Sequence, residues 1–146
     1  MRYYWLFALI LGSILPAGCG EQEADEIRLR KFSNHLFLVS WPVFEENGIT
    51  PSGLVAYNKK MDAGLTVIGG NVVSQQLDGN FLFGKKEAFK SPFSDTSSFS
   101  EDWKKSGYFL VEMQQFNNFK WRGLDAPKVE WFSDEKSLIR ALRLKK

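Results

Sequence analysis

The spacing of turn-forming residues constrains the fold of this chain more than any other feature of its sequence. Between residues 36 and 83, pairs such as Asn47-Gly48, Gly69-Gly70 and Asp78-Gly79 interrupt the apolar runs before any of them is long enough for an ordinary helix. The runs between them are rich in β-branched and aromatic residues, which favour strands. The predicted strands in this region are 36–41, 54–57, 65–68, 72–77 and 80–83.

The strongest hairpin signal is Asp78-Gly79, which stands between two of these runs. An Asp-Gly pair favours a type I′ turn, because that turn needs a positive φ at both of its central residues. We therefore expect an antiparallel hairpin at this position.

The second half of the chain adds two strands and a helix. Residues 108–113 alternate, with Phe109, Val111 and Met113 on one face, and residues 129–132 read as a last strand. Ser133 is the expected N-cap of a terminal helix, whose apolar side combines Leu138, Ala141 and Leu142. A short helix near 99–106, ending at Gly107, is also expected from a capping-box pattern. The predicted fold class is α+β, mainly an antiparallel β-sheet with a C-terminal helix.

The N-terminal segment has the pattern of an export signal. Arg2 precedes a stretch, residues 3–15, that holds 13 residues and no charge. This length fits the apolar region of a signal peptide, roughly 7–15 residues. It is short of the about 20 residues that a membrane-spanning helix requires. Small residues then lead to Cys19, the single cysteine of the chain.

The stretch Leu15-Pro16-Ala17-Gly18-Cys19 resembles the lipobox of bacterial lipoproteins, whose usual form is Leu-Ala-Gly-Cys. Pro16 holds the usual place of the leucine. The resemblance implies a diacylglycerol on the Cys19 thiol, cleavage before Cys19, and an acyl chain such as palmitate on the new amino group. Gly20 rather than Asp after the cysteine implies sorting to the periplasmic face of the outer membrane in a cell with two membranes.

Three other interpretations of the N-terminal segment stay open. They are cleavage by ordinary signal peptidase after Gly20, an uncleaved short anchor, and a buried helix of a cytosolic protein. The lipoprotein interpretation divides the chain into a signal peptide (1–18), a lipidated cysteine with an acidic tether (19–27) and a single globular domain (28–146). It places the protein in the cell envelope, with the membrane as a partner through the lipid.

The net charge and the kinds of residue present argue against several classes of function. The net charge is +2, and losing Arg2 with the signal peptide leaves +1, which argues against a nucleic-acid partner. His35 is the only histidine and is expected to be structural; no catalytic residue, metal site or cofactor is predicted. Adjacent residues of a strand face opposite sides, so Glu45-Glu46 is expected in an exposed loop rather than as a catalytic pair.

The sequence therefore leans away from an enzyme and toward a non-catalytic binding, assembly or accessory module. Aromatic, amide and basic residues gather before Gly123, and Phe119, Trp121 and Arg122 are the candidate surface for an envelope protein or glycan partner. Two alternatives remain. One is a small envelope hydrolase for peptidoglycan or polysaccharide, acting through carboxylates such as Glu112 or Asp125. The other is an inhibitor or immunity-type protein.

Overall fold

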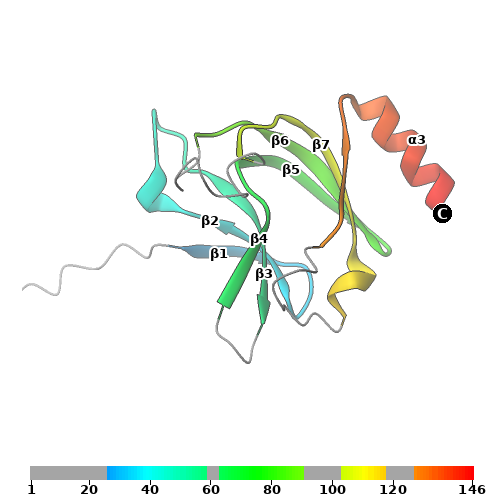
Figure 1. The fold of residues 1–146 in the computed structure, drawn as a ribbon, viewed down its shortest axis with the longest axis horizontal. Helices are drawn as coiled ribbons and strands as arrows, with labels where there is room; N and C mark the ends of the chain where they lie inside the picture. The colour runs from blue at the N-terminus through cyan, green and yellow to red at the C-terminus, as the bar shows by residue number, and fades with distance from the viewer. Residues whose placement is uncertain (1–25, 59–62, 91–102, 118–126) are drawn as a thin grey trace, which may run out of the picture.

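The computed structural model of this chain describes residues 26–58, 63–90, 103–117 and 127–146, which form an antiparallel sheet with a C-terminal helix (Figure 1). The described strands are β1 (Ile27–Lys31), β2 (Leu36–Ser40), β3 (Ser52–Asn58), β4 (Ala63–Ile68), β5 (Asn71–Asp78), β6 (Phe81–Glu87), β7 (Gly107–Glu112) and β8 (Val129–Phe132). They pair in the order β1-β2-β3-β5-β6-β7-β8, with β4 on β3. The helix is α3 (Glu135–Lys145), and η1 (Pro42–Phe44) and η2 (Met113–Phe116) are 3-10 helices. The predicted fold class is confirmed.

The sheet bends sharply where β4 passes into β5. The two strands are joined only by Gly69 and Gly70, yet β4 pairs with β3 whereas β5 pairs with β6. Gly70 has a φ of +121°, a conformation that other residues rarely adopt. A single parallel pair, Ser52 with Asn71, joins β3 to β5 beside the bend. The predicted break at Gly69-Gly70 is thus the point where the sheet divides into two halves, β1–β4 and β5–β8.

The main core lies between these two halves. Alternate residues of each strand point inward, as strand geometry requires. The inward residues of the first half are mostly leucine and valine, and those of the second half include Phe109 and Val111. The fully buried members of this inner core are Leu36, Leu54, Ala56, Ile68, Leu82, Phe109, Val111 and Phe116.

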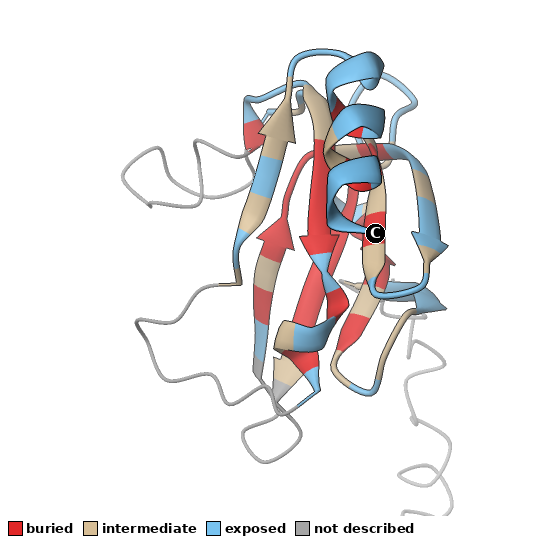
Figure 2. Cartoon of the chain, turned by 90° about the vertical axis from the view of Figure 1, so that its right-hand side faces the viewer, coloured by how far each residue is buried: buried red, intermediate tan, exposed pale blue. Residues whose placement is uncertain are grey.

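Each half is also covered by apolar side chains on its outer face. Over β6 and β7, α3 packs Leu138 and Leu142 against Leu110 and neighbouring aromatic rings, and its polar face points to solvent (Figure 2). Over β2 and β3, Trp41 and Trp103 pack with their ring centroids 5.1 Å apart. Strands covered on both sides read as continuous apolar runs. This explains why the alternation is imperfect in the sequence.

The predicted β5–β6 hairpin is confirmed, but the predicted turn type is wrong. Asp78 pairs with Phe81, so Gly79 and Asn80 are the central residues. Of these two, only Gly79 has a positive φ, at +57°, which is the pattern of a type II′ turn. The type I′ pattern occurs instead in the hairpin that pairs Glu46 with Ile49, where Asn47 and Gly48 both have positive φ.

The boundaries of the helices differ from the sequence expectation in two places. The N-cap of α3 is Asp134, whose carboxylate accepts a hydrogen bond of 2.9 Å from the backbone amide of Ser137, and Ser133 precedes it. Gly107 does not end a helix but begins β7. Residues 99–102 of the expected short helix lie outside the described residues; Trp103 is helical and Lys104 lies in a turn.

One strand is absent from the sequence prediction. β1 contains Arg28, Arg30 and Lys31, and all five of its residues are exposed. It begins at Ile27, the last residue of the predicted tether. Within the described ranges, no helix combines the length and apolar character needed to span a bilayer.

Candidate functional site

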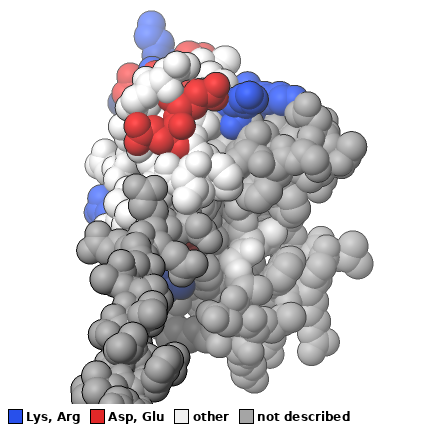
Figure 3. Space-filling model, turned by 90° about the vertical axis from the view of Figure 1, so that its left-hand side faces the viewer, with Lys and Arg blue, Asp and Glu red and all other residues white. Residues whose placement is uncertain are grey.

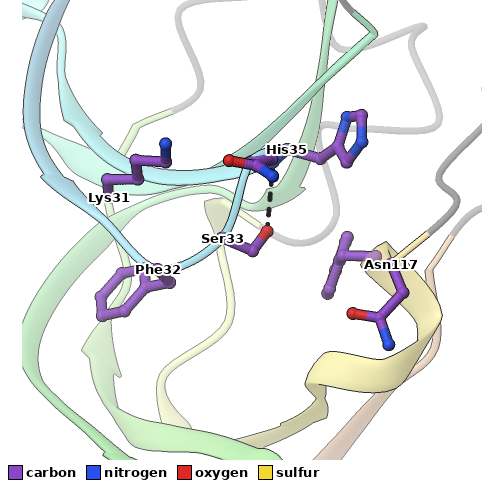
Figure 4. A pocket seen from close by; sticks show the side chains of 7 residues that line it. Lys31, Phe32, Ser33, His35 and Asn117 are labelled. Atoms are coloured by element: carbon purple, nitrogen blue, oxygen red, sulfur yellow. Dashed lines mark hydrogen bonds between the residues drawn. The ribbon is translucent and has the colours of Figure 1, made fainter.

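A cavity of about 430 Å³ lies where the β1–β2 connection meets η2 (Figure 4). This volume falls within the about 300–1,000 Å³ that is usual for small-molecule sites. Figure 4 shows Lys31 and Asn117 on opposite sides of it, with Ser33 between them. The residues that line it are Lys31, Phe32, Ser33, Asn34, His35, Phe116 and Asn117.

Ser33 fixes the loop that forms one wall of the cavity. Its hydroxyl oxygen accepts hydrogen bonds from the backbone amides of His35, at 3.1 Å, and Leu36, at 3.0 Å. The backbone amide of Phe32 donates to the carbonyl of Leu36 at 2.9 Å. Local bonds of this kind hold a serine-containing turn in one conformation. The cavity wall is therefore ordered before any ligand binds.

His35 joins this loop to β3. Its backbone carbonyl accepts a 2.7 Å hydrogen bond from the amide of Tyr57, and its Nδ1 lies 2.9 Å from the carbonyl oxygen of Tyr57. A ring nitrogen held by a backbone carbonyl has one tautomer fixed, with Nδ1 as the donor. The structural role expected for His35 thus has a defined partner.

The basic residues of β1 pack on aromatic rings before the chain reaches the cavity. The Arg28 guanidinium lies 4.2 Å from the ring centroid of Tyr57 and 4.8 Å from that of Phe37. Arg30 lies 5.0 Å from the ring of Phe32, itself a cavity residue. Such cation–π contacts orient long side chains that would otherwise be free. Lys31 remains exposed at the cavity rim.

A carboxylate marks the start of β1. Trp41 Nε1 donates a 3.2 Å hydrogen bond to the carboxylate of Glu26. Partial burial raises the pKa of Glu26, opposed by this hydrogen bond and by the charge of Arg28. Burial disfavours the charged form of a carboxyl group. Its effect on the pKa of Glu26 is larger than the combined opposing effect of the Trp41 hydrogen bond and the Arg28 charge.

The opposite wall of the cavity is held by η2. Phe116 is fully buried in the inner core, which fixes the position of the exposed Asn117 beside it. The Gln115 side-chain amide both accepts from the Lys128 amide, at 2.8 Å, and donates to its carbonyl, at 3.2 Å. Among the residues that line the cavity, Asn34 and Asn117 carry side-chain amides and Lys31 carries an ammonium group. Groups of this kind suit a partner with hydroxyl or carboxylate oxygens.

The residues predicted from the sequence as sites fall outside the described residues. These are Cys19 and the candidate binding residues Phe119, Trp121 and Arg122. Asn117, which lines the cavity, precedes Phe119 by two positions in the sequence. Sequence reasoning missed the cavity itself, although Ser33 and Asn34, two loop-forming polar residues between strands, were a signal for an ordered connection.

The carboxylates considered for hydrolysis have other roles where the structure describes them. Glu112 pairs with Lys145 at 2.8 Å, and Lys145 also reaches Glu130 at 2.8 Å. These hydrogen bonds, with Glu112 foremost, raise the pKa of Lys145. Glu45 and Glu46 are exposed in the turn region, as expected. Asp125 lies outside the described residues. In the described part of the chain, no three His, Cys, Asp or Glu side chains gather as a metal site.

The surface charge does not have a single sign on the face seen from the left of Figure 1. Figure 3 shows acidic side chains grouped with basic ones beside them among the residues drawn in colour. Such mixed surfaces produce short-range pairing rather than a long-range field.

Comparisons with known proteins add no relative from which a function could be transferred. No protein-family model, no curated protein and no solved structure matches this chain.

Proposed function

We propose that this protein is a lipid-anchored protein of a bacterial envelope whose domain serves as a non-catalytic binding module. The observation that carries the proposal is Leu15-Pro16-Ala17-Gly18-Cys19, placed directly after an uncharged stretch of signal-peptide length. Stable membrane attachment needs two or more acyl chains, and full lipoprotein maturation supplies three.

The position of β1 supports this proposal. Eight residue steps separate Cys19 from Ile27, the first residue of the sheet. An extended chain spans at most about 3.3–3.6 Å per residue, so the sheet begins within about 30 Å of the lipidated cysteine. A lipid on Cys19 would therefore hold the start of the domain close to the membrane surface.

Intact-mass spectrometry of the protein extracted from membranes tests the anchor. We expect the mass of a chain that begins at Cys19 and carries lipid, and we expect a Cys19→Ala variant to remain unprocessed. An unmodified chain that still carries residues 1–18 would contradict the proposal. A chain cut after Gly20 would also contradict it, and would indicate ordinary signal peptidase.

The binding site that we propose for this module is the cavity between the β1–β2 connection and η2. Trp121, the binding residue proposed from the sequence, lies outside the described residues and is tested beside it. The volume of the cavity suits a small ligand, and its exposed amide and ammonium groups suit oxygen-rich partners. Of the two partner classes expected from the sequence, an envelope glycan fits this chemistry better than a large protein surface.

Co-sedimentation of the full chain with purified peptidoglycan tests this site. Asn117→Ala and Trp121→Ala are expected to weaken binding at least tenfold, a loss of about 1.4 kcal/mol. Asn80→Ala, an exposed asparagine in the β5–β6 turn, is the matched control and should bind normally. Folded variants that keep full binding would contradict the site, and absence of binding by the unmodified chain would contradict the glycan.

A further inference from the structure

The open edges of the sheet differ in how they are protected. Among the described strands, an edge without a neighbouring described strand is found on β1, β4, β5 and β8. On β5, this edge carries only the single pair with β3. Natural proteins protect such edges with charges, bulges or short strands, because unpaired backbone groups otherwise recruit another chain. β1 is basic, and β8 has four residues including the ion-paired Glu130. β4 carries a bulge at Val67, and its Leu65, Val67 and Ile68 are buried.

β5 lacks most of this protection. It is the longest described strand, with eight residues, and Asn71 to Leu77 carry no charge. Its only charged residue, Asp78, is paired with Lys146 at the end of the chain. Val73 and Leu77 are 46% and 39% exposed, although both are large apolar residues. The single irregularity is a bulge at Val73, so the stretch from Ser74 to Leu77 remains regular.

A small groove lies beside this edge on the outer face of the sheet. Its floor includes Phe83 and Tyr108, and one wall is formed by residues of α3, namely Leu138, Ile139 and, at the start of the helix, the charged Glu135. Ser74, Gln75 and Gln76 of β5 form the side at the open edge. Its volume of about 180 Å³ is below that of small-molecule sites, about 300–1,000 Å³, and suits a single side chain instead.

We propose that the free edge of β5 binds an extended, uncharged segment of a partner protein as an added strand, with one apolar side chain of the segment in the groove beside α3. In strand addition, backbone hydrogen bonds give affinity and pockets for alternate side chains give specificity. The uncharged edge favours an uncharged segment, because burying an unpaired charge against it is unfavourable. This surface is separate from the cavity at η2 and does not depend on the lipid anchor.

Calorimetric titration of the full chain in detergent with a model peptide tests this binding mode. The probe is a capped seven-residue peptide that alternates valine and threonine. Its control has the same side chains but carries a methyl group on every backbone nitrogen, which removes its donors. We expect the first peptide to bind at least about tenfold more tightly than the methylated one, because several backbone hydrogen bonds each contribute modestly.

Two variants of the protein locate the binding edge. Gln76→Lys places a charge on β5 and is expected to weaken peptide binding at least about fivefold, as edge lysines do in natural sheets. Gln114→Lys makes the same change at an exposed position of η2 and should bind like the unmodified chain. Hydrogen exchange with bound peptide should show slower exchange of the β5 amides from Val73 to Leu77.

Three results would overturn the proposal. The first is equal affinity for the methylated peptide, which would indicate apolar adhesion without strand pairing. The second is protection elsewhere than in β5. The third is concentration-dependent self-association that protects β5 without peptide and is abolished by Gln76→Lys, which would identify a second copy of this chain as the occupant.

Discussion

Lys86 is the residue whose position is least expected from its type. In β6 it follows Leu82 and Gly84 on the inner face, and its side chain is completely buried. Its ammonium group donates a 2.5 Å hydrogen bond to the carbonyl of Gly69 and lies 5.3 Å from the ring centroid of Trp131. A buried ammonium group is tolerated only with such partners. Lys86 therefore connects β6 to the bend between the halves and to β8.

We expect Lys86→Met to lower the free energy of unfolding by about 1.5–3 kcal/mol, the usual contribution of a hydrogen bond to a charged group. The substitution keeps a long apolar chain but leaves the Gly69 carbonyl without this donor. Urea unfolding followed by circular dichroism measures the change. Lys85→Met, the neighbour on the outer face, is the control and should change stability by less than about 0.5 kcal/mol. Equal effects of the two variants would contradict a special role for Lys86.

The role of Lys86 was not evident in the sequence because the predicted strand ended at Phe83. A Lys-Lys pair after an apolar run is typical of an exposed strand end. The strand in fact continues to Glu87, and alternation then directs Lys86 inward while Lys85 faces outward. Strand length depends on pairing with β7, a contact remote in sequence. Local residue types therefore could not fix it.

Among the elements, α3 shows how an amphipathic pattern becomes a layer of the fold. The predicted apolar side is correct, because Leu138 and Leu142 are buried against β7. Leu144 lies on the same helix but is 82% exposed. The helix thus contains two buried leucines and one exposed leucine, so the contribution of packing can be measured by comparing them.

Leu142→Ala is expected to destabilise the protein by about 2–3 kcal/mol, near the lower limit for buried leucines because the site is at the margin of a small cluster. Leu144→Ala should cost less than about 0.5 kcal/mol, since its side chain is already in water. Chemical denaturation of both variants provides the comparison. Similar losses would contradict a specific role for packing on β7, because helix propensity favours alanine over leucine at both positions.

The N-cap of α3 makes its stability depend on pH. Hydrogen bonds from Ser137, first its backbone amide and then its hydroxyl, hold the pKa of Asp134 below its ordinary value. A lowered pKa in the folded state means that the carboxylate stabilises the fold above its ordinary pKa. This contribution disappears as the pH falls through the pKa of the folded state.

Asp134→Ala should therefore lower the melting temperature at neutral pH, and the difference from the unmodified chain should shrink in strongly acidic solution. Ser133→Ala, at the N-cap position predicted from sequence, is expected to have the smaller effect at neutral pH. Thermal melts monitored by circular dichroism at several pH values test both statements. A larger effect of Ser133→Ala would show that the helix begins one residue earlier.

The elements differ in how far sequence could predict them. Strands such as β7 and β8 were found because aromatic and β-branched residues dominate them. β1 was missed because an edge strand that is exposed along its whole length has no apolar face. Residues such as Arg28 and Arg30 are typical of a solvated segment. The cavity was missed because its two walls, the β1–β2 connection and η2, are about eighty residues apart and meet only through the fold.

At the scale of the whole molecule, the three apolar clusters share strands. β2 and β3 carry the inner core on one face and the Trp41–Trp103 cluster on the other. β7 carries Phe109 toward the inner core and Leu110 toward α3. Loss of the inner core would therefore remove the support of both outer layers. A molecule built in this way is expected to unfold as one cooperative unit.

Equilibrium unfolding of the full chain in detergent should then show one transition. Tryptophan fluorescence reports on the packed Trp41 and Trp103 and on Trp131 of β8, which packs on Phe109 in the inner core, whereas far-ultraviolet circular dichroism includes α3. We expect both signals to give the same midpoint, and Leu142→Ala to shift both together although it lies in the α3 layer alone. If the circular dichroism change occurred first and the tryptophan signal kept its original midpoint, α3 would be an independent unit. The shared strand β7 would then be too weak a connection to make the three layers one cooperative structure.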